Sequence, residues 1–446
     1  CAQWKGIEEM HEKFHYKSLE EIRQRAAELG EWLPLEEDVS ILTSPMRLGD
    51  WTLPNRIALQ PMEGTDGTED GAPGPLTIRR YHRFAKGGAA LIWFEAVATA
   101  PEVRASAHQL YLTPDNLDDF KRLVGEIKEI GLKENGFAPI VIMQATNSGR
   151  YSKPHGYPEP IIAYNNPIFE GDSPIPAERI VTDDQLRRYE EKYTLTARLA
   201  QQAGFDGIDI KCCHRYLACE LLSAYTRPGE YGGSFENRTR FLRNCYRAAM
   251  AGVTGKYVFS SRLNAYDGFP YPYGFGVEEG GSLVPKIDEA VELVGLLQKE
   301  FGIPFIDITI GNPYKNPHVN RPYDVGNYVP DEHPFTGLSR MMRCVSTIQK
   351  AHPDLPVIGS AFSYLRQYSA NLAAGMLAGG HAAMAGFGRM AFANPDFPNQ
   401  LKEHGAIDAA KVCLTCGNCA QLLRAGIPAG CVIRDRESYS MEALKK

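Results

Sequence analysis

Short apolar runs alternate with longer amphipathic stretches from about residue 54 onward. Most runs are followed by a segment with the apolar period of a helix, as at residues 287–301. Alternating strands and helices favour a parallel sheet with helical crossovers, and eight units most simply close into a (β/α)8 TIM barrel. Eight runs of this kind occur, at residues 56–60, 90–95, 139–144, 207–211, 257–263, 304–310, 356–360 and 382–386.

A doubly wound open sheet is the competing α/β arrangement. It normally carries a glycine-rich turn directly after its first strand. Here the first run is followed by Pro61-Met62-Glu63-Gly64-Thr65, and the glycines at 274–280 have the wrong spacing and lie well past the nearest predicted strand. The pattern therefore favours a barrel over residues 46–400.

Two further segments flank the predicted barrel. Residues 1–45 predict a helical N-terminal extension, because Ser18 to Glu21 form a capping-box pattern and Gly30 suits the helix end. Residues 401–446 form a C-terminal segment that holds four of the ten cysteines. The other six cysteines are scattered, which argues against a secreted disulfide framework.

Composition narrows the class of protein. The chain has 446 residues, 43% of them hydrophobic, which is enough for a large core. Its formal net charge of −6 argues against nucleic acid or an anionic membrane as a partner. No apolar run is long enough to span a bilayer, and the first residues, which begin at Cys1 and not at Met, are no signal peptide. We expect a cytoplasmic protein.

The carboxyl ends of barrel strands carry the active residues of such folds. Small residues after strands seven and eight form the common barrel phosphate site, where Arg389 would add a fixed cation; the alternative is that these glycines only close tight turns. The candidate residues at the strand ends are Pro61, Met62, Glu63, Gln144, Lys211, His214, Tyr216, Arg262, Gly359, Ser360, Gly386, Gly388 and Arg389.

Several groups of residues, in the right order across 46–400, resemble the old yellow enzyme family. They are Pro54-Asn55-Arg56 with Pro61-Met62, Gln144 with Gly149-Arg150, residues 207–216 running into 230–238, and Gly388-Arg389 with Asn394-Pro395-Asp396. Each group alone is weak, but the combination is specific. The resemblance implies an oxidoreductase with FMN at the top of the barrel.

The resemblance also implies roles for the cofactor residues. Gln144 would hydrogen-bond the flavin pyrimidine, and Arg262 would stabilise negative charge near flavin N1. Pro61 and Met62 would pass under the ring by their backbone, and Glu63 occupies a position that tunes the flavin in relatives. Gly359, Gly388 and Arg389 would hold the phosphate.

The fourth strand end carries the catalytic candidates. Relatives place a pair of donors and a tyrosine there, at the positions of Lys211, His214 and Tyr216. Donors stabilise the enolate oxygen that forms when hydride reaches the β-carbon, and tyrosine is a suitable acid for the α-carbon. Lys211 departs from the family's histidine: it could donate, favour a carboxylate or thioester substrate, or pair with a nearby acid. His318 is a further donor candidate, with a surface position as the alternative.

The C-terminal cysteines predict a metal centre. Cys413, Cys416 and Cys419 are spaced to wrap one corner of a cluster, and Cys431 would close it, which suits a [4Fe–4S] cluster. Structural zinc and free thiols are the alternatives. The segment resembles the iron–sulfur branch of the family, typified by 2,4-dienoyl-CoA reductase and trimethylamine dehydrogenase, and it suggests an anaerobic cell.

The source of electrons is left open by the sequence. Relatives of the iron–sulfur branch continue into flavodoxin-like and nucleotide-binding domains, which have no counterpart before residue 446. We therefore expect electrons either from NAD(P)H bound directly over FMN or from a redox partner protein through the cluster.

Three functions follow in order of preference. The first is an ene-reductase that reduces the C=C bond of an α,β-unsaturated ketone, acid or thioester. The second is oxidative amine or demethylation chemistry with electrons leaving through the cluster, and the third is a non-catalytic redox subunit of a larger complex. An amine would need an aromatic bowl. The residues that could build one are Tyr151, Tyr157, Tyr164, Tyr314 and Tyr323.

Overall fold

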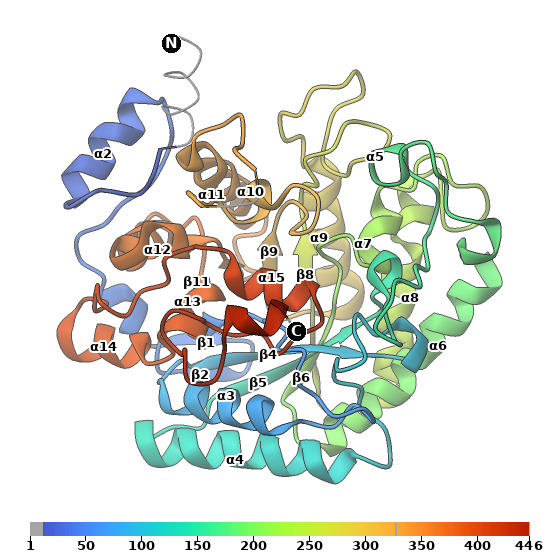
Figure 1. The fold of residues 1–446 in the computed structure, drawn as a ribbon, viewed down its shortest axis with the longest axis horizontal. Helices are drawn as coiled ribbons and strands as arrows, with labels where there is room; N and C mark the ends of the chain where they lie inside the picture. The colour runs from blue at the N-terminus through green and yellow to red at the C-terminus, as the bar shows by residue number, and fades with distance from the viewer. Residues whose placement is uncertain (1–11, 326–327, 446) are drawn as a thin grey trace.

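A closed parallel barrel forms the centre of the molecule (Figure 1). The computed structural model describes residues 12–325 and 328–445. The sheet order is β7-β6-β5-β4-β3-β11-β10-β9-β8, and because only Ser261 separates β7 from β8, these are two halves of one strand and the sheet closes on itself. The strands are β3 (Ile57–Leu59), β4 (Leu91–Ala98), β5 (Ile140–Thr146), β6 (Gly207–Ile210), β7 (Val258–Ser260), β8 (Arg262–Asn264), β9 (Ile306–Thr309), β10 (Val357–Gly359) and β11 (Met384–Phe387).

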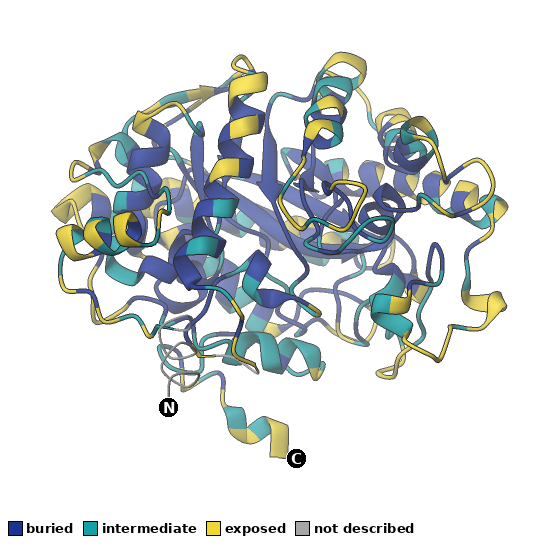
Figure 2. Ribbon diagram, turned by 90° about the horizontal axis from the view of Figure 1, so that it is seen from above, coloured by how far each residue is buried: buried dark blue, intermediate teal, exposed yellow. Residues whose placement is uncertain are grey.

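Each of the eight predicted strands is present, so the predicted TIM barrel is confirmed. The main helices form an outer ring whose inner faces are buried and, except in α12, whose outer faces are largely exposed (Figure 2). They are α3 (Pro75–Lys86), α4 (Leu117–Asn135), α6 (Asp183–Gln202), α8 (Phe235–Gly252), α9 (Asp288–Phe301), α11 (Pro334–Ala351), α12 (Ser369–Ala378) and α14 (Phe397–His404).

An antiparallel hairpin, β1 (Met46–Leu48) and β2 (Trp51–Leu53), closes the amino-terminal end of the barrel. Its buried residues Leu48 and Leu53 join a hydrophobic cluster with Trp93 and Phe305, from inside the barrel. This packing leaves the carboxyl ends of the strands as the open face.

The N-terminal extension contains the predicted helix, α2 (Leu19–Glu28). The Ser18 side chain accepts a hydrogen bond from the Glu21 backbone at 3.2 Å, while the Glu21 carboxylate accepts from the backbone of Lys17. Gly30, with φ +69°, ends the helix as expected. Residues 1–11 of the predicted extension lie outside the described residues.

The C-terminal segment crosses the open face of the barrel (red in Figure 1). It is tied to the loop after β3, because the Ala429 N–H donates to the Gly64 carbonyl at 2.7 Å and the Thr65 hydroxyl donates to the Ile427 carbonyl at 2.6 Å. The short helix α15 (Asn418–Arg424) therefore lies over the ends of the strands. No helix within the described residues is long and apolar enough to cross a membrane.

Candidate active site

A cavity of about 1020 Å³ opens at the carboxyl ends of the strands. Its wall brings together twelve of the thirteen residues predicted from the strand ends: Pro61, Met62, Glu63, Gln144, Lys211, His214, Tyr216, Arg262, Ser360, Gly386, Gly388 and Arg389. Gly359 does not line it. Helix α15 covers one side and contributes Cys419 and Arg424 to the wall.

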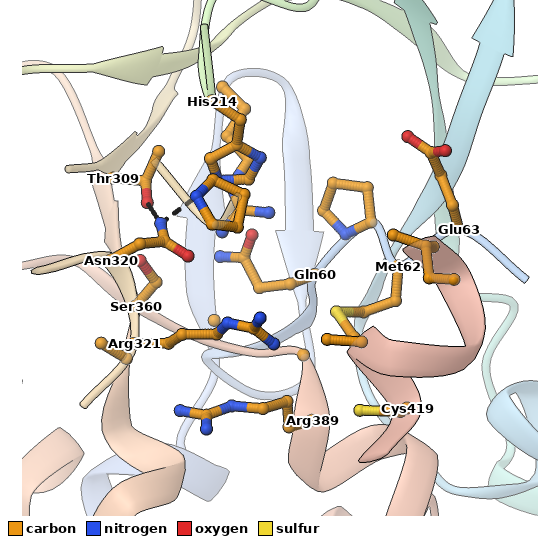
Figure 3. Close-up of a pocket in the computed structure, with 18 of the residues that line it drawn as sticks. Gln60, Met62, Glu63, His214, Thr309, Asn320, Arg321, Ser360, Arg389 and Cys419 are labelled. Atoms are coloured by element: carbon orange, nitrogen blue, oxygen red, sulfur yellow. Dashed lines mark hydrogen bonds between the residues drawn. The ribbon is translucent and has the colours of Figure 1, made fainter. Parts of the chain in front are cut away.

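Two guanidinium groups, those of buried Arg389 and half-buried Arg321, lie at one end of this cavity (Figure 3). Arg389 is 7% exposed, and Arg321 lies close enough that burial, and then the charge of Arg389, lower the Arg321 pKa to about 10. No carboxylate pairs with either side chain among the described residues. Two such cations without an acidic partner favour binding of an anion.

Sequence reasoning missed Arg321. It lies in the loop after β9, outside any of the quoted motifs, and its only signal was a positive charge close to a strand end.

The glycines near Arg389 are required by packing: a Cβ on Gly386 would lie 1.9 Å from Gln60 Nε2, and one on Gly388 would lie 3.0 Å from Met62 Sδ. Glycine is therefore needed at both positions to leave room for the neighbouring side chains.

Buried carboxylates orient the polar side chains on the cavity floor. Asp209 accepts from Gln144 Nε2 at 2.6 Å and from the Arg262 backbone N–H at 2.8 Å. Asp307 lies 3.2 Å from Arg262 Nε and accepts from Gln60 Nε2 at 3.1 Å. Burial raises the pKa of Asp209 to about 6 and that of Asp307 to about 7. Sequence reasoning did not single out these two acids. The signal that could have found them is an acidic residue inside an otherwise apolar strand.

Glu63 and Lys211 form an ion pair beside Tyr216. Lys211 Nζ lies 3.2 Å from Glu63 Oε1 and 3.7 Å from the centroid of the Tyr216 ring. The Tyr216 hydroxyl donates to the same Glu63 oxygen at 3.1 Å. Of the three interpretations of Lys211, pairing with a nearby acid is the one this geometry matches. The Glu63 side chain that makes this ion pair lies on the cavity wall.

His214 is held as a neutral imidazole. Burial, followed by the charges of Arg262 and Lys211, lowers its pKa well below the ordinary value. Asn320 Nδ2 lies 3.3 Å from His214 Nε2 and donates to the Ile310 carbonyl at 2.8 Å, so it fixes the position of the ring. His214 and Arg215 both have positive φ, 60° and 62°, in the turn that follows β6. Arg215 itself turns into the core, where it pairs with Asp267 at 3.1 Å.

The remaining donor and aromatic candidates do not assemble as one group. His318 does not line the cavity; it contacts Tyr328 and lies 3.8 Å from Glu332. Of the five tyrosines, Tyr157 is 59% exposed and Tyr164 is buried against Ser223. Tyr314 lines the cavity with Tyr151 stacked on it, at 4.0 Å between ring centroids.

The cysteine segment lies beside the same cavity. Cys413 is buried, and Cys419 lies on the cavity wall near Met62 and Arg389 (Figure 3). Burial raises the pKa of the Cys413 and Cys419 thiols, and the neighbouring cysteines contribute to the same shift. Within residues 12–325 and 328–445, no group of three or more His, Cys, Asp or Glu side chains is arranged to hold a metal ion. The predicted [4Fe–4S] cluster thus stays a prediction.

Comparison with known sequences identifies relatives of this chain. The profile of the NADH:flavin oxidoreductase / NADH oxidase family matches residues 42–283. An NADPH dehydrogenase of Geobacillus thermodenitrificans is 32% identical over 281 residues, which cover 61% of this chain and 73% of that protein. An NADH oxidase of Thermoanaerobacter brockii is 28% identical over 388 residues, 84% of this chain and 52% of that protein.

Solved structures share the fold. A 2-naphthoyl-CoA reductase complex superposes with a TM-score of 0.72 at 20% identity, over 89% of this chain and 57% of that one. Morphinone reductase gives 0.61 at 22% identity, over 82% and 92%. An amine oxidase of Pseudomonas geniculata gives 0.67 at 17% identity, over 89% and 54%. The chain thus spans little more than half the length of several relatives.

The profile match covers more than half of the chain, and the barrel with its strand-end cavity has the same architecture as these flavin enzymes. This chain belongs to the NADH:flavin oxidoreductase / NADH oxidase family, that of old yellow enzyme, and is a flavin-dependent oxidoreductase.

Proposed function

We propose that this protein is an FMN-dependent ene-reductase that saturates the C=C bond of an α,β-unsaturated carbonyl compound. One observation carries the proposal: Tyr216, a buried acid, and His214, a neutral donor, line the same cavity. That cavity also holds Arg321 and Arg389, for which the described residues offer no carboxylate partner. An ene-reductase needs both halves of this arrangement: a cofactor anchor and a proton donor beside the substrate.

The cavity residues fit FMN. Arg389, which is buried, and Arg321, which is half-buried, would hold the phosphate, because no acid of the described residues pairs with either. Gln144 and Arg262 would hold the pyrimidine ring, and the backbone of Pro61 and Met62 would support the isoalloxazine. When bound, FMN supplies the hydride that reaches the β-carbon.

The chain's own residues supply the oxygen contact and the proton. His214, neutral at pH 7, would donate a hydrogen bond to the substrate carbonyl oxygen, where negative charge develops. Tyr216 would then give its hydroxyl proton to the α-carbon. Burial, and next the Glu63 carboxylate, raise the pKa of Tyr216 well above its ordinary value, so the Tyr216 hydroxyl stays protonated across the physiological pH range.

The electron source and the cluster belong to the same proposal. Relatives named NADPH dehydrogenase and NADH oxidase support NAD(P)H as the electron donor. The spacing of Cys413, Cys416, Cys419 and Cys431 supports a [4Fe–4S] cluster held by their thiolates, with a partner redox protein as an additional route for electrons.

Amine oxidation is the weaker candidate. An amine cation would be held on an aromatic face. The Tyr216 face already carries the Lys211 ammonium at 3.7 Å, and the Arg424 guanidinium lies 6.0 Å from the Tyr314 ring. Lys211 thus occupies the ring face that an amine would need, and the Arg424 cation would repel a substituted ammonium ion.

Turnover of the FMN-loaded protein tests the proposal. We expect NADPH or NADH oxidation that depends on 2-cyclohexenone or crotonyl-CoA and not on trimethylamine. Tyr216→Phe should lower enone turnover about 100-fold, the typical contribution of a general acid, while flavin reduction by NAD(P)H stays unchanged. Flavin that is reduced but never reoxidised by any enone or enoyl thioester would rule out ene reduction.

A further inference from the structure

Four polar atoms form a continuous chain through the proposed proton donor. Lys211 Nζ lies 3.2 Å from Glu63 Oε1, Glu63 Oε1 lies 3.1 Å from Tyr216 Oη, and Tyr216 Oη lies 3.0 Å from Tyr314 Oη. The four side chains come from three different strand ends, those of β3, β6 and β9. Three of the four are at most 9% exposed, so the contacts are shielded from bulk water.

Tyr314 is the member that borders two cavities. It lines the active cavity, and it also lines a second cavity of about 660 Å³ beside the cysteine segment. The wall of the second cavity includes Lys315 and Val325, both exposed, so water reaches it. Tyr314 therefore lies between the second cavity and the buried Tyr216, with its hydroxyl 3.0 Å from the Tyr216 hydroxyl.

We propose that Glu63, Lys211 and Tyr314 are positioning residues that supply Tyr216 with protons: Tyr314 passes a proton inward from the second cavity, and Glu63, neutralised by Lys211, orients the Tyr216 hydroxyl. The inference rests on the proposed ene reduction, because it assigns the source of the proton for that reaction.

Protons balance along this route. In the proposed step the Tyr216 O–H bond breaks as the C–H bond at the substrate α-carbon forms, while the hydride has added to the β-carbon. The Tyr314 O–H bond then breaks and the Tyr216 O–H bond forms again. Water in the second cavity restores the Tyr314 proton, and the hydroxide left behind takes a proton from the solvent.

The electrostatics explain why a resupply route matters. A tyrosinate at position 216 would be buried beside the Glu63 carboxylate, and burial followed by Glu63 raises the Tyr216 pKa. The opposing charges are Lys211, over the Tyr216 ring, and Arg424, which lies 6.0 Å from the Tyr314 ring. A deprotonated Tyr216 is thus high in free energy, so we expect it to be reprotonated quickly.

The first test needs no turnover. Tyrosinate absorbance is titrated with pH in the FMN-loaded protein and in Tyr216→Phe, and their difference reports ionisation of Tyr216. In a Glu63→Gln background we expect that ionisation at lower pH, because a carboxylate is lost and the Lys211 ammonium stays. An unchanged midpoint would overturn the role of Glu63, whether or not any enone is reduced.

The second test concerns Tyr314. Enzyme whose flavin has been reduced with light is mixed with 2-cyclohexenone, and reoxidation is followed in H₂O and D₂O. Tyr314→Phe should leave this single reoxidation nearly unchanged, because Tyr216 starts protonated. It should slow multiple turnover about tenfold and raise the solvent isotope effect on turnover, with flavin reduction by NADPH unchanged. The matched control is Tyr151→Phe, whose hydroxyl accepts from Asn312 at 2.8 Å outside the chain.

The outcomes separate the two proposals. Equal rates and isotope effects for Tyr314→Phe and Tyr151→Phe would overturn the relay while leaving ene reduction intact. Failure of the unmodified enzyme with every enone would overturn the proposed reaction, and the Glu63→Gln titration would then still decide whether the Tyr216 contact exists.

Discussion

At the scale of single residues, unpaired charge is the most informative feature of this cavity. A buried or half-buried guanidinium without a carboxylate is expensive to maintain, so its presence points to an anion that arrives with the cofactor. Arg321 and Arg389 meet this description, whereas Arg262 is paired with Asp307. The phosphate end of the site can thus be told from the pyrimidine end by charge pairing alone.

Loss of Arg321 should weaken FMN binding. A charge-assisted contact to a phosphate is worth about 1.5–3 kcal/mol, so Arg321→Gln should raise the FMN dissociation constant of the apoprotein by about 10- to 100-fold. Quenching of FMN fluorescence measures this directly. Arg122→Gln, a change at an exposed helix position, is the matched control. Equal affinities in the two variants would contradict a phosphate role for Arg321.

Asp209 should make stability fall as pH rises. Burial lifts its pKa from 3.8 to about 6, so the folded state binds more protons than the unfolded state between these values. The stabilisation is complete below about pH 4 and is lost through pH 6, by about 1 kcal/mol between pH 5 and 8. Urea unfolding of the wild type and Asp209→Asn at both pH values measures it. The free energy of unfolding of the wild type relative to that of Asp209→Asn should be smaller at pH 8 than at pH 5, and a difference that does not change with pH would contradict the prediction.

At the scale of elements, the apolar pattern was sufficient for the strands because each is buried on both sides. β6 and β9 each carry one acid among apolar neighbours, Asp209 and Asp307, and were still recognised by their short runs. The pattern could not show that the strand at 257–263 breaks at Ser261, because that break depends on pairing with two different neighbours.

Contacts between elements were the harder part of the site. The motifs identified strand-end residues one by one, and the cavity gathers nearly all of them. Arg321 and Asn320 were missed because they come from a long loop whose path is set by tertiary packing. The pairing of Lys211 with Glu63 joins residues 148 positions apart, a distance over which a single sequence carries no pairing signal.

The C-terminal segment should be released when its anchor is removed. The Asp435 carboxylate accepts from Arg79 at 2.7 and 2.9 Å and also contacts Arg83, on helix α3. Both arginines are partly exposed, so we discount the contact to about 1 kcal/mol. Asp435→Asn should therefore increase the rate of tryptic cleavage within residues 405–445 about fivefold. Asp408→Asn, in the same segment but without these contacts, should cleave at the wild-type rate.

At the scale of the whole molecule, the cysteine segment and the flavin cavity share a wall. Helix α15 places Cys419 and Arg424 on the cavity while Cys416 lines the second cavity behind it. Arg321 and Arg389 line both spaces. A cluster held by these cysteines would therefore lie directly beside the flavin phosphate end, and the two basic side chains would offset the negative charge of both groups.

Removal of one cysteine should separate the cluster from the barrel. Four thiolates hold a [4Fe–4S] cluster and three hold it poorly, so Cys416→Ser should lose most iron and the broad sulfur-to-iron absorbance of anaerobically purified protein. FMN should stay bound, because its proposed contacts lie on the barrel strands. Cys344→Ser, at a buried cysteine of helix α11, is the matched control and should keep both cofactors. Wild-type protein that binds zinc and no iron would replace the cluster with a structural zinc site, and electrons would then have to reach FMN from NAD(P)H alone.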